Sequence, residues 1–229
     1  MLERVKAMVE AQLARGFSGR AGAGERRDLA GRNVVITGGA GGLGRAFAEA
    51  FSAAGARIAL LDLSEDALRA AVRDLSLRGV SCLAVTCDIT REAECEEALA
   101  RVREEQGPVE ILINNAGITH IGEFGDAGPA DVRRVMDVNV FGAVNVTYFA
   151  LEDLKRTRGA IVAVSSVAGI APLFGRTGYA ASKHALHGFY DTLRCELEEH
   201  GVDVTLLCPS MIATDMRRLG ARLQEERGL

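Results

Sequence analysis

From residue 33 onward, short apolar runs alternate with longer amphipathic stretches. A run of about five residues that is apolar at consecutive positions is typical of a strand covered on both faces, as in a parallel sheet. Strands are therefore expected at NVVIT (33–37), RIALLD (57–62), CLAVTC (82–87), EILIN (110–114), AIVAVS (160–165) and DVTLLC (203–208). Helices are expected at GRAFAEAFSAAG, SEDALRAAVRDLSLRG, REAECEEALARVREEQG, DVRRVMDVNVFGAVNVTYFALEDLKR and YAASKHALHGFYDTLRCELEEHG.

This alternation predicts an α/β protein with a parallel sheet and helices on both faces. The expected fold is a Rossmann-type doubly wound sheet in three αβα layers, with six strands in the order 3-2-1-4-5-6. Glycines stand where four of the helices should end, as is usual for a helix C-terminus. They are Gly55, Gly79, Gly107 and Gly201.

The N-terminal 30 residues differ from the rest of the chain. Residues 1–15 place Leu2, Val5, Val9 and Leu13 near helical spacing, and a glycine-rich charged linker follows. We therefore expect an N-terminal helical arm and linker over residues 1–30, and one cofactor-binding catalytic domain over residues 31–229. Packing on a partner subunit, weak binding to a membrane surface and a frayed tail all stay open for the arm.

Composition narrows the classes of function. The chain has 229 residues, 48% hydrophobic and 25% charged, with a net charge of −4, so no basic surplus indicates a nucleic-acid partner. No apolar run is long enough to span a membrane, and the N-terminus lacks the apolar stretch of a secretory signal. We expect a soluble cytoplasmic protein.

The cysteines and histidines indicate neither disulfides nor a metal site. Five cysteines, an odd number, occur without a CxxC pair, and Cys82, Cys87 and Cys208 are expected to be buried reduced thiols. His184 and His187 could share a helix face, but no third ligand stands at a familiar spacing. We therefore expect no metal.

The glycine-rich stretch TGGAGGLGRAF (37–47) follows the first strand and opens the first helix. Gly39, Gly41 and Gly44 satisfy a GxGxxG pattern. In this position a diphosphate can bind the free N–H groups of the first helical turn, and glycines let the backbone approach it closely. The alternative is a tight turn that binds no ligand.

Asp62 ends the second strand. A carboxylate there can accept hydrogen bonds from ribose hydroxyls and would repel a 2′-phosphate, which favours NAD over NADP. The alternative, that Asp62 caps the next helix, competes with Ser64, which is the better-placed cap. Arg45 lies nearby in sequence and could serve a phosphate, so NADP is less favoured but stays open.

Tyr179 and Lys183 are four residues apart, so on a helix they share a face. A free tyrosine loses its proton only near pH 10, and a nearby ammonium stabilises the phenolate. Such a pair can take the proton of an alcohol or return it to a carbonyl. The alternative is an accidental pair on a surface helix.

At these residues the chain resembles the short-chain dehydrogenase/reductase family. The motifs occur in the family's order from about residue 33 to residue 216. They are TGGAGGLG (Thr37, Gly38, Gly42, Gly44), CDIT (Asp88, Ile89), NNAG (Asn114, Asn115, Ala116, Gly117), Asn139 in DVNVFGA, Ser166 after VS, YAASK (Tyr179, Lys183) and CPSMIAT (Pro209, Ile212, Thr214).

The resemblance implies a catalytic set of Asn139, Ser166, Tyr179 and Lys183. Ser166 would polarise the substrate oxygen; it stands 13 residues before Tyr179, the family's separation, whereas alternation along a strand turns Ser165 to the other side. Asn139 would hold a water beside Lys183. The cofactor would contact Thr37, Gly38, Gly42, Leu43, Gly44, Asp62, Leu63, Asp88, Ile89, Asn115, Ala116, Gly117, Tyr179, Lys183, Pro209, Ile212 and Thr214.

The chain departs from the family at two places. Ser210 replaces a frequent glycine, and only 15 residues follow Thr214, so the usual further helix and seventh strand are expected to be absent. The apolar loop VAGIAPLFGRTG (167–178), with His120 and Phe124 on the opposite wall, indicates a hydrophobic alcohol or ketone, such as a steroid-like, fatty or aromatic carbonyl.

Three functions stay open from the sequence. The first is hydride transfer between NAD(H) and a secondary alcohol or its ketone. The second is an NADPH-dependent ketoacyl-carrier reductase, and the third is a regulator that binds the cofactor without catalysis. The helices that carry Asn139 and Tyr179 resemble those that pair subunits in this family, so a homodimer or homotetramer is expected. Tyr148 and Tyr190 are expected in the core or at an interface.

Overall fold

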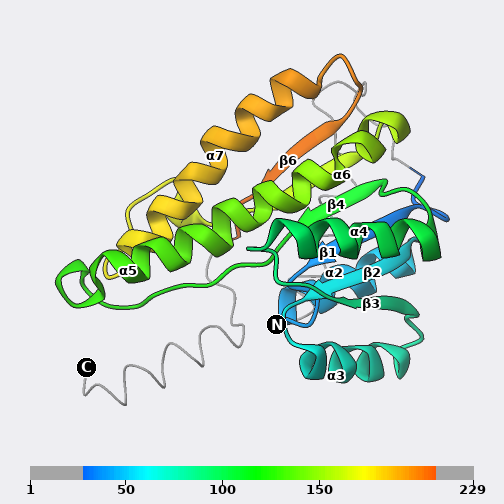
Figure 1. The fold of residues 1–229 in the computed structure, drawn as a ribbon, viewed down its shortest axis with the longest axis horizontal. Coiled ribbons are helices and arrows are strands. Elements are labelled where there is room, and N and C mark those ends of the chain that lie inside the picture. The colour runs from blue at the N-terminus through cyan, green and yellow to red at the C-terminus, as the bar shows by residue number, and fades with distance from the viewer. Residues whose placement is uncertain (1–27, 210–229) are drawn as a thin grey trace.

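Six parallel strands form one sheet in the order β3-β2-β1-β4-β5-β6 (Figure 1). This computed structural model describes residues 28–209. The strands are β1 (Asn33–Thr37), β2 (Arg57–Asp62), β3 (Cys82–Thr86), β4 (Ile111–Asn114), β5 (Ala160–Val164) and β6 (Asp203–Leu207). The predicted fold class, strand positions and strand order are confirmed.

Helices connect consecutive strands and cover both faces of the sheet. They are α2 (Gly42–Ala53), α3 (Glu65–Ser76), α4 (Glu92–Gln106), α5 (Phe124–Met136), α6 (Ala143–Thr157) and α7 (Thr177–Leu197), with short helical segments η1 (Asp137–Gly142) and η2 (Val167–Gly169). In Figure 1, α4 and α6 cross the face of the sheet that is turned toward the viewer.

The core has two layers because neighbouring strand residues point to opposite faces. In β1, Val34 and Ile36 pack with Phe47 of α2, whereas Val35 packs on the side of α4, α6 and α7. Side chains of β1 are all buried, which explains the three consecutive apolar residues at its centre, Val34, Val35 and Ile36. The four predicted glycine ends are also confirmed: Gly55, Gly79, Gly107 and Gly201 all have positive φ.

The long helix expected over residues 131–156 is divided. Regular α-helix ends at Met136, and η1 over Asp137–Gly142 is a π-helical segment before α6 begins. Gly142 lies against the side chain of Ile89, and a Cβ there would come within 2.6 Å of Ile89 Cδ1. Asn139 lies within this π-helical segment, and such segments often occur at functional sites.

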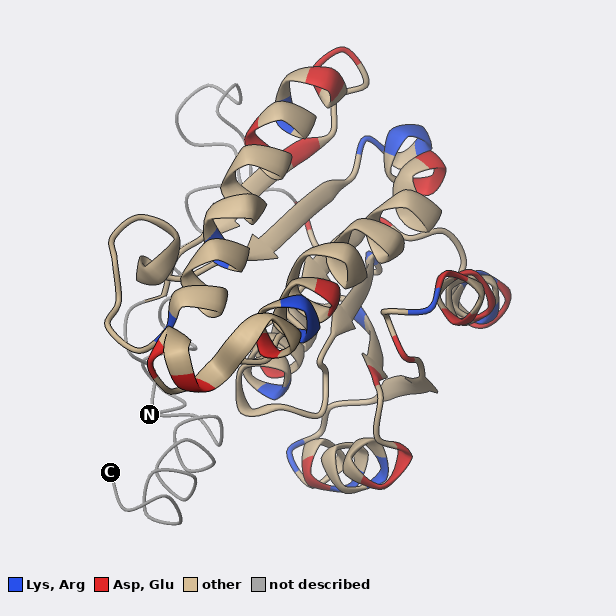
Figure 2. Cartoon of the chain, turned by 60° about the vertical axis from the view of Figure 1, so that its left-hand side comes forward, with Lys and Arg blue, Asp and Glu red and all other residues tan. Residues whose placement is uncertain are grey.

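Charged residues of both signs are spread over the helices (Figure 2). No helix within residues 28–209 is both long enough and apolar enough to cross a membrane.

Candidate active site

The glycine loop joins β1 to α2 at the carboxyl end of the sheet. Gly44 is required by packing, because a Cβ there would lie 2.4 Å from Gly38 O. Gly42 is different: outside its own helix, a Cβ on it would meet no atom of residues 28–209 within 4 Å, and its φ is not positive. Packing of the described residues therefore does not require a glycine at 42, whereas a ligand that approaches the backbone closely would.

The N-terminus of α2 is open to an anion. Its N-cap, Gly41, provides no side-chain hydrogen bond, and its first turn has no acidic residue. The next helix shows the contrast, since Ser64 Oγ accepts a hydrogen bond from Ala67 N and Glu65 and Asp66 follow. The unpaired N–H groups of α2 therefore fit a diphosphate.

Asp62 lies beside this loop at the end of β2. Its carboxylate accepts hydrogen bonds from Ala40 N (3.0 Å) and Ser64 N (3.3 Å). Ser64 caps α3, as expected, so Asp62 is not the cap. Arg45, the residue that could have served a phosphate, instead pairs with Asp74 of α3 at 3.3 Å. Leu63 beside Asp62 is 68% exposed.

The glycine loop is fixed to the NNAG segment by Thr37. Thr37 Oγ1 accepts hydrogen bonds from Asn115 N and Ala116 N, both at 3.0 Å. Asn115 Nδ2 donates to Thr37 O and Gly38 O. Gly38 has φ +62° and lies so close to Ala116 Cα that a Cβ would come within 2.8 Å. The two motifs are therefore held against each other, although 77 residues separate Gly38 from Asn115.

Lys183 is buried below Tyr179 on α7. Its ammonium lies 5.6 Å from the centre of the Tyr179 ring and donates a 2.8 Å hydrogen bond to Val164 O, at the end of β5. Lys183 is 4% exposed, and burial lowers its pKa to about 8. At pH 7 the ammonium is therefore still largely protonated, close to a phenol that is only partly buried.

The two serines after β5 face different surroundings. Ser165 is buried; its Oγ donates to Lys183 O and lies 3.0 Å from His187 Nε2. Ser166 is partly exposed, and its Oγ accepts a hydrogen bond from Ala168 N. Since Ser166 Oγ acts there as an acceptor, its own hydrogen is available to a substrate oxygen. This difference agrees with the choice of Ser166 over Ser165.

Asn139 joins the segment after β4 to α7. Its Oδ1 accepts a hydrogen bond from Ile118 N, and its Nδ2 donates to Ile118 O and to Ser182 Oγ. Gly117 comes close to both Asn139 and Lys183, since a Cβ on it would lie 3.2 Å from Asn139 Oδ1 and 3.6 Å from Lys183 Nζ. The side chain of Asn139 thus positions the wall around Lys183, and its expected role toward a water stays a prediction.

The remaining predicted cofactor residues lie at the same end of the sheet. Asp88 and Ile89 follow β3; the Asp88 carboxylate accepts hydrogen bonds from Thr90 N and Oγ1, and Ile89 is 8% exposed. Leu43 of α2 packs partly against the core, and Pro209 O accepts a hydrogen bond from Val167 N. Ile212 and Thr214, like Ser210 and the N-terminal arm, lie outside the described residues.

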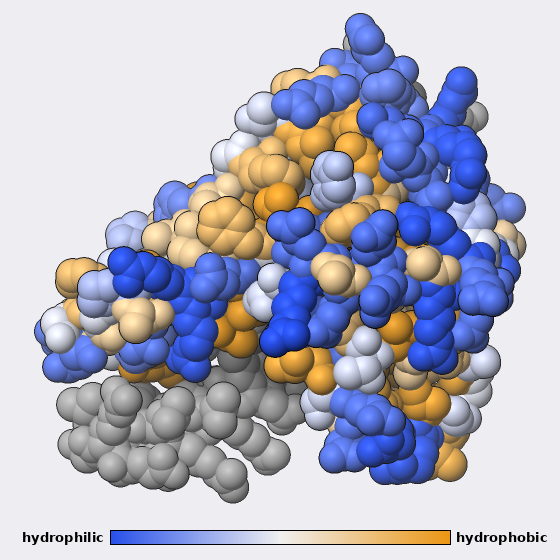
Figure 3. Space-filling model, viewed as in Figure 1, coloured by the Kyte–Doolittle hydropathy of each residue, from blue (hydrophilic) through white to orange (hydrophobic). Residues whose placement is uncertain are grey.

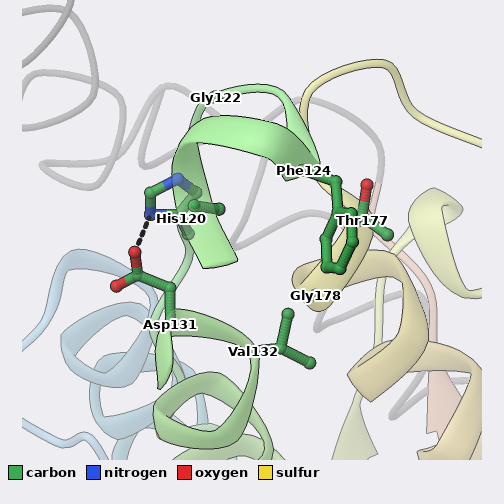
Figure 4. A pocket seen from close by; sticks show the side chains of 8 residues that line it. His120, Gly122, Phe124, Asp131, Val132, Thr177 and Gly178 are labelled. Carbon is green, nitrogen blue, oxygen red and sulfur yellow. Dashed lines mark ion pairs between the residues drawn. The ribbon is translucent and has the colours of Figure 1, made fainter. Parts of the chain in front are cut away.

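His120 and Phe124 line a small hollow together with the start of α7 (Figure 4). Their expected place on the wall of a substrate pocket stays a prediction. Phe124 faces Thr177 and Gly178, and His120 Nδ1 lies 3.5 Å from Asp131 Oδ2. Thr177 and Gly178 immediately precede Tyr179 in the sequence. His120 Nε2 is buried without a hydrogen-bond partner among the described residues.

One polar contact at the site was not predicted from the sequence. Arg176, just before α7, donates from Nη1 to Thr119 Oγ1 at 2.6 Å. Its spacing from Tyr179, three residues, was a signal that could have been used, because such a pair is adjacent on a helix. Thr119, 57 residues away, gave no signal.

The cysteines and tyrosines differ partly from expectation. All five cysteines are free thiols, but only Cys87 of the three predicted thiols is buried; Cys82 and Cys208 are half-buried, and Cys95 is also buried. The described residues contain no cluster suited to a metal ion. Tyr190 is in the core, whereas Tyr148 of α6 is 70% exposed. Figure 3 shows apolar surface along α6. Pairing of subunits there stays a prediction.

The chain belongs to the short chain dehydrogenase family, whose model matches residues 32–223. Dehydrogenase/reductase SDR family member 7B of Bos taurus is 40% identical over 190 residues, covering 80% of this chain and 58% of that protein. Oxidoreductase UcpA of Salmonella typhimurium is 38% identical over 196 residues, covering 85% of this chain and 74% of that protein. This chain thus spans little more than half the length of the first of these relatives.

Solved structures of similar fold extend the comparison. A short chain dehydrogenase/reductase from Burkholderia phymatum, in complex with NAD, is 32% identical with a TM-score of 0.79, covering 84% of this chain and 71% of that one. Levodione reductase is 28% identical with a TM-score of 0.80, covering 84% of this chain and 76% of that one.

Proposed function

We propose that this protein is a nicotinamide-dependent oxidoreductase that interconverts a secondary alcohol and its ketone. The observation that carries the proposal is the buried Lys183 ammonium 5.6 Å from the centre of the Tyr179 ring. Lys183 bonds to Val164, the last residue of β5, and Ser166 follows two residues later. The glycine loop after β1, proposed to bind the diphosphate, lies at the same edge of the sheet. Oxidoreductases among the relatives and the NAD complex of a structural neighbour support the assignment.

The cofactor would lie across the carboxyl ends of the strands. Gly42 and the first turn of α2 would hold its diphosphate, and Asp62 its ribose hydroxyls. When bound, the nicotinamide would supply or accept the hydride. Because Asp62 disfavours a 2′-phosphate and Arg45 is paired with Asp74, we propose NAD(H) rather than NADP(H).

Proton transfer would be carried out by residues of α7 and β5. Tyr179 would take the hydroxyl proton of the alcohol or return it to the ketone. Lys183, held by Val164 O, would stabilise the phenolate through its charge. The Ser166 hydroxyl would donate a hydrogen bond to the substrate oxygen as negative charge develops on it.

A hydrophobic carbonyl compound is the proposed substrate class. The loop between η2 and α7 carries large apolar side chains that are exposed to solvent: Ile170 is 66%, Leu173 42% and Phe174 88% exposed. Burial of these side chains against a substrate would contribute to its binding.

A Tyr179→Phe variant tests the proposal. Loss of the acid/base group should lower turnover by about 100- to 10,000-fold, with little change in cofactor binding. Turnover of a panel of ketones would be followed by the absorbance of reduced nicotinamide. NADH and NADPH would be titrated by their fluorescence, with tighter binding expected for NADH.

The matched control is Tyr148→Phe, which removes a hydroxyl from the exposed face of α6 and should leave turnover unchanged. Undiminished turnover by the Tyr179→Phe variant would refute the assigned acid/base residue. If neither dinucleotide bound to the wild-type protein, the proposed class of reaction would be wrong.

A further inference from the structure

Arg176 is a half-buried cation at the candidate active site. It stands at the N-cap of α7, and its guanidinium interacts electrostatically with Tyr179. Burial lowers the pKa of Arg176, which indicates that its charge is partly removed from water. Within residues 28–209 the guanidinium has no carboxylate partner; its hydrogen bond there joins Nη1 to the neutral hydroxyl of Thr119.

Partly buried charges in proteins are normally paired, because desolvation costs free energy that an opposite charge recovers. Arg45 illustrates this elsewhere in the same protein, through its ion pair with Asp74. With Nη1 bound to Thr119, the other edge of the Arg176 guanidinium, Nε and Nη2, has no partner among the described residues. That edge is a fork that matches the two oxygens of a carboxylate.

The surroundings of Arg176 favour an anion as well. Arg176 provides no side-chain cap for α7, and the first turn of this 21-residue helix contains no acidic residue. The positive end of the helix dipole therefore adds to the guanidinium charge. The hollow lined by Thr177, the residue after Arg176, also contains a carboxylate, that of Asp131, which lies 3.5 Å from His120 Nδ1 (Figure 4).

We propose that Arg176 binds a carboxylate on the substrate, so that the preferred substrates are apolar keto acids and hydroxy acids rather than neutral carbonyl compounds. This inference rests on the proposed function and deepens it. The apolar loop Ile170–Phe174 would cover the body of such a molecule, Tyr179 and Ser166 would contact its reacting oxygen, and the free edge of Arg176 would bind its acidic end.

Pairs of a keto acid and its methyl ester separate the carboxylate from the rest of the substrate. We would use three pairs with different spacings between the two groups: phenylpyruvate, levulinate and para-acetylbenzoate, each with its methyl ester. For at least one pair the wild-type protein should have about a 10- to 100-fold higher kcat/KM for the acid, mainly through KM. Arg176→Gln should lower kcat/KM for the acid by about tenfold or more beyond any change for the ester, so that the preference is lost, and Arg176→Lys should be intermediate.

Arg73→Gln is the control, since Arg73 is an exposed arginine on α3, and it should behave as wild type. If Arg176 acted only by stabilising the Tyr179 phenolate, Arg176→Gln would shift the pH profile and lower kcat equally for acid and ester. Either that result, or a wild-type protein with no preference for any acid, would overturn the proposal.

A binding measurement keeps this inference separate from the proposed reaction. Calorimetric titration of para-acetylbenzoate into the NAD-loaded protein should show about 10- to 100-fold weaker binding to Arg176→Gln than to wild type. Equal binding by both proteins would refute the carboxylate site. If none of the six compounds were turned over while the difference in binding persisted, the proposed reaction would fail and the carboxylate site would stand.

Discussion

The buried ammonium of Lys183 imposes a cost on folding that depends on pH. Burial lowers its pKa from 10.5 to about 8. Between these values the unfolded chain binds a proton that the native protein does not, so stability rises as pH increases through this window. Below about pH 8 the lysine is charged in both states and the full cost is present. The difference amounts to about 3 kcal/mol.

The effect of Lys183→Met on the free energy of unfolding is therefore expected to depend on pH. Relative to this variant, the wild-type free energy of unfolding should be about 3 kcal/mol higher at about pH 10 than at about pH 7. Urea unfolding of both proteins without cofactor would measure it. Lys155→Met is the control, because Lys155 lies at the surface of α6, where it pairs with Glu152. A wild-type-to-variant difference that is the same at both pH values would contradict the account.

The role of a residue could be predicted from the sequence where it depends only on neighbouring residues. Ser64 as a helix cap and the glycines after α2, α3, α4 and α7 depend on a few neighbouring residues. The choice of Ser166 over Ser165 followed from strand alternation and family spacing. The contact of Arg176 with Thr119 was missed because it joins residues 57 positions apart, which spacing along the chain does not reveal.

At the scale of elements, α2 contains two glycines with different reasons for being there. Gly44 allows the helix to approach Gly38, whereas a Cβ on Gly42 would point into space that the surrounding described residues do not fill. Gly44→Ala should lower the free energy of unfolding by several kcal/mol, because its Cβ would overlap backbone atoms that cannot move freely. Gly42→Ala should leave stability equal or up to about 1 kcal/mol higher, because alanine favours the helix.

The same two variants separate binding from folding. Gly42→Ala should weaken NADH binding by about tenfold or more, because its Cβ would enter the space proposed for the diphosphate. Urea unfolding without cofactor and titration of NADH fluorescence would measure the two effects. Unchanged NADH affinity in Gly42→Ala would show that the diphosphate does not lie over this residue.

The order of the strands and helices was predictable, but the side-chain contacts between them and the irregular segment within one of the helices were not. Alternating apolar runs and amphipathic stretches are sufficient for a parallel doubly wound sheet. Asp153 shows the limit: it is a buried carboxylate on α6 that accepts hydrogen bonds from Arg103 of α4, from Arg156 and from Val109 N. The π-helical segment at Asp137–Gly142 was also missed; its last residue, Gly142, lies against Ile89, far away in the sequence.

At the scale of the whole molecule, the sheet changes winding direction between β1 and β4, and ligands of such sheets bind in the crevice at this point. Thr37 spans the crevice, since its Oγ1 accepts hydrogen bonds from Asn115 N and Ala116 N and donates a long one to Ile113 O. This contact fixes the half that carries the glycine loop relative to the half that carries Ser166 and Tyr179.

Thr37→Val should therefore affect both stability and function. Valine has nearly the same shape, but it leaves Ala116 N without its acceptor and removes one of the two acceptors of Asn115 N, which also donates to Ile113 O. This should cost about 1–3 kcal/mol. Urea unfolding would measure this cost, and NADH titration should show weaker binding because the glycine loop loses its support. Thr192→Val is the matched control: Thr192 is exposed on α7 and bonds only to Gly188 O among the described residues, so its stability should change by less than about 0.5 kcal/mol. Equal effects of the two substitutions would mean that Thr37 does not hold the two halves together.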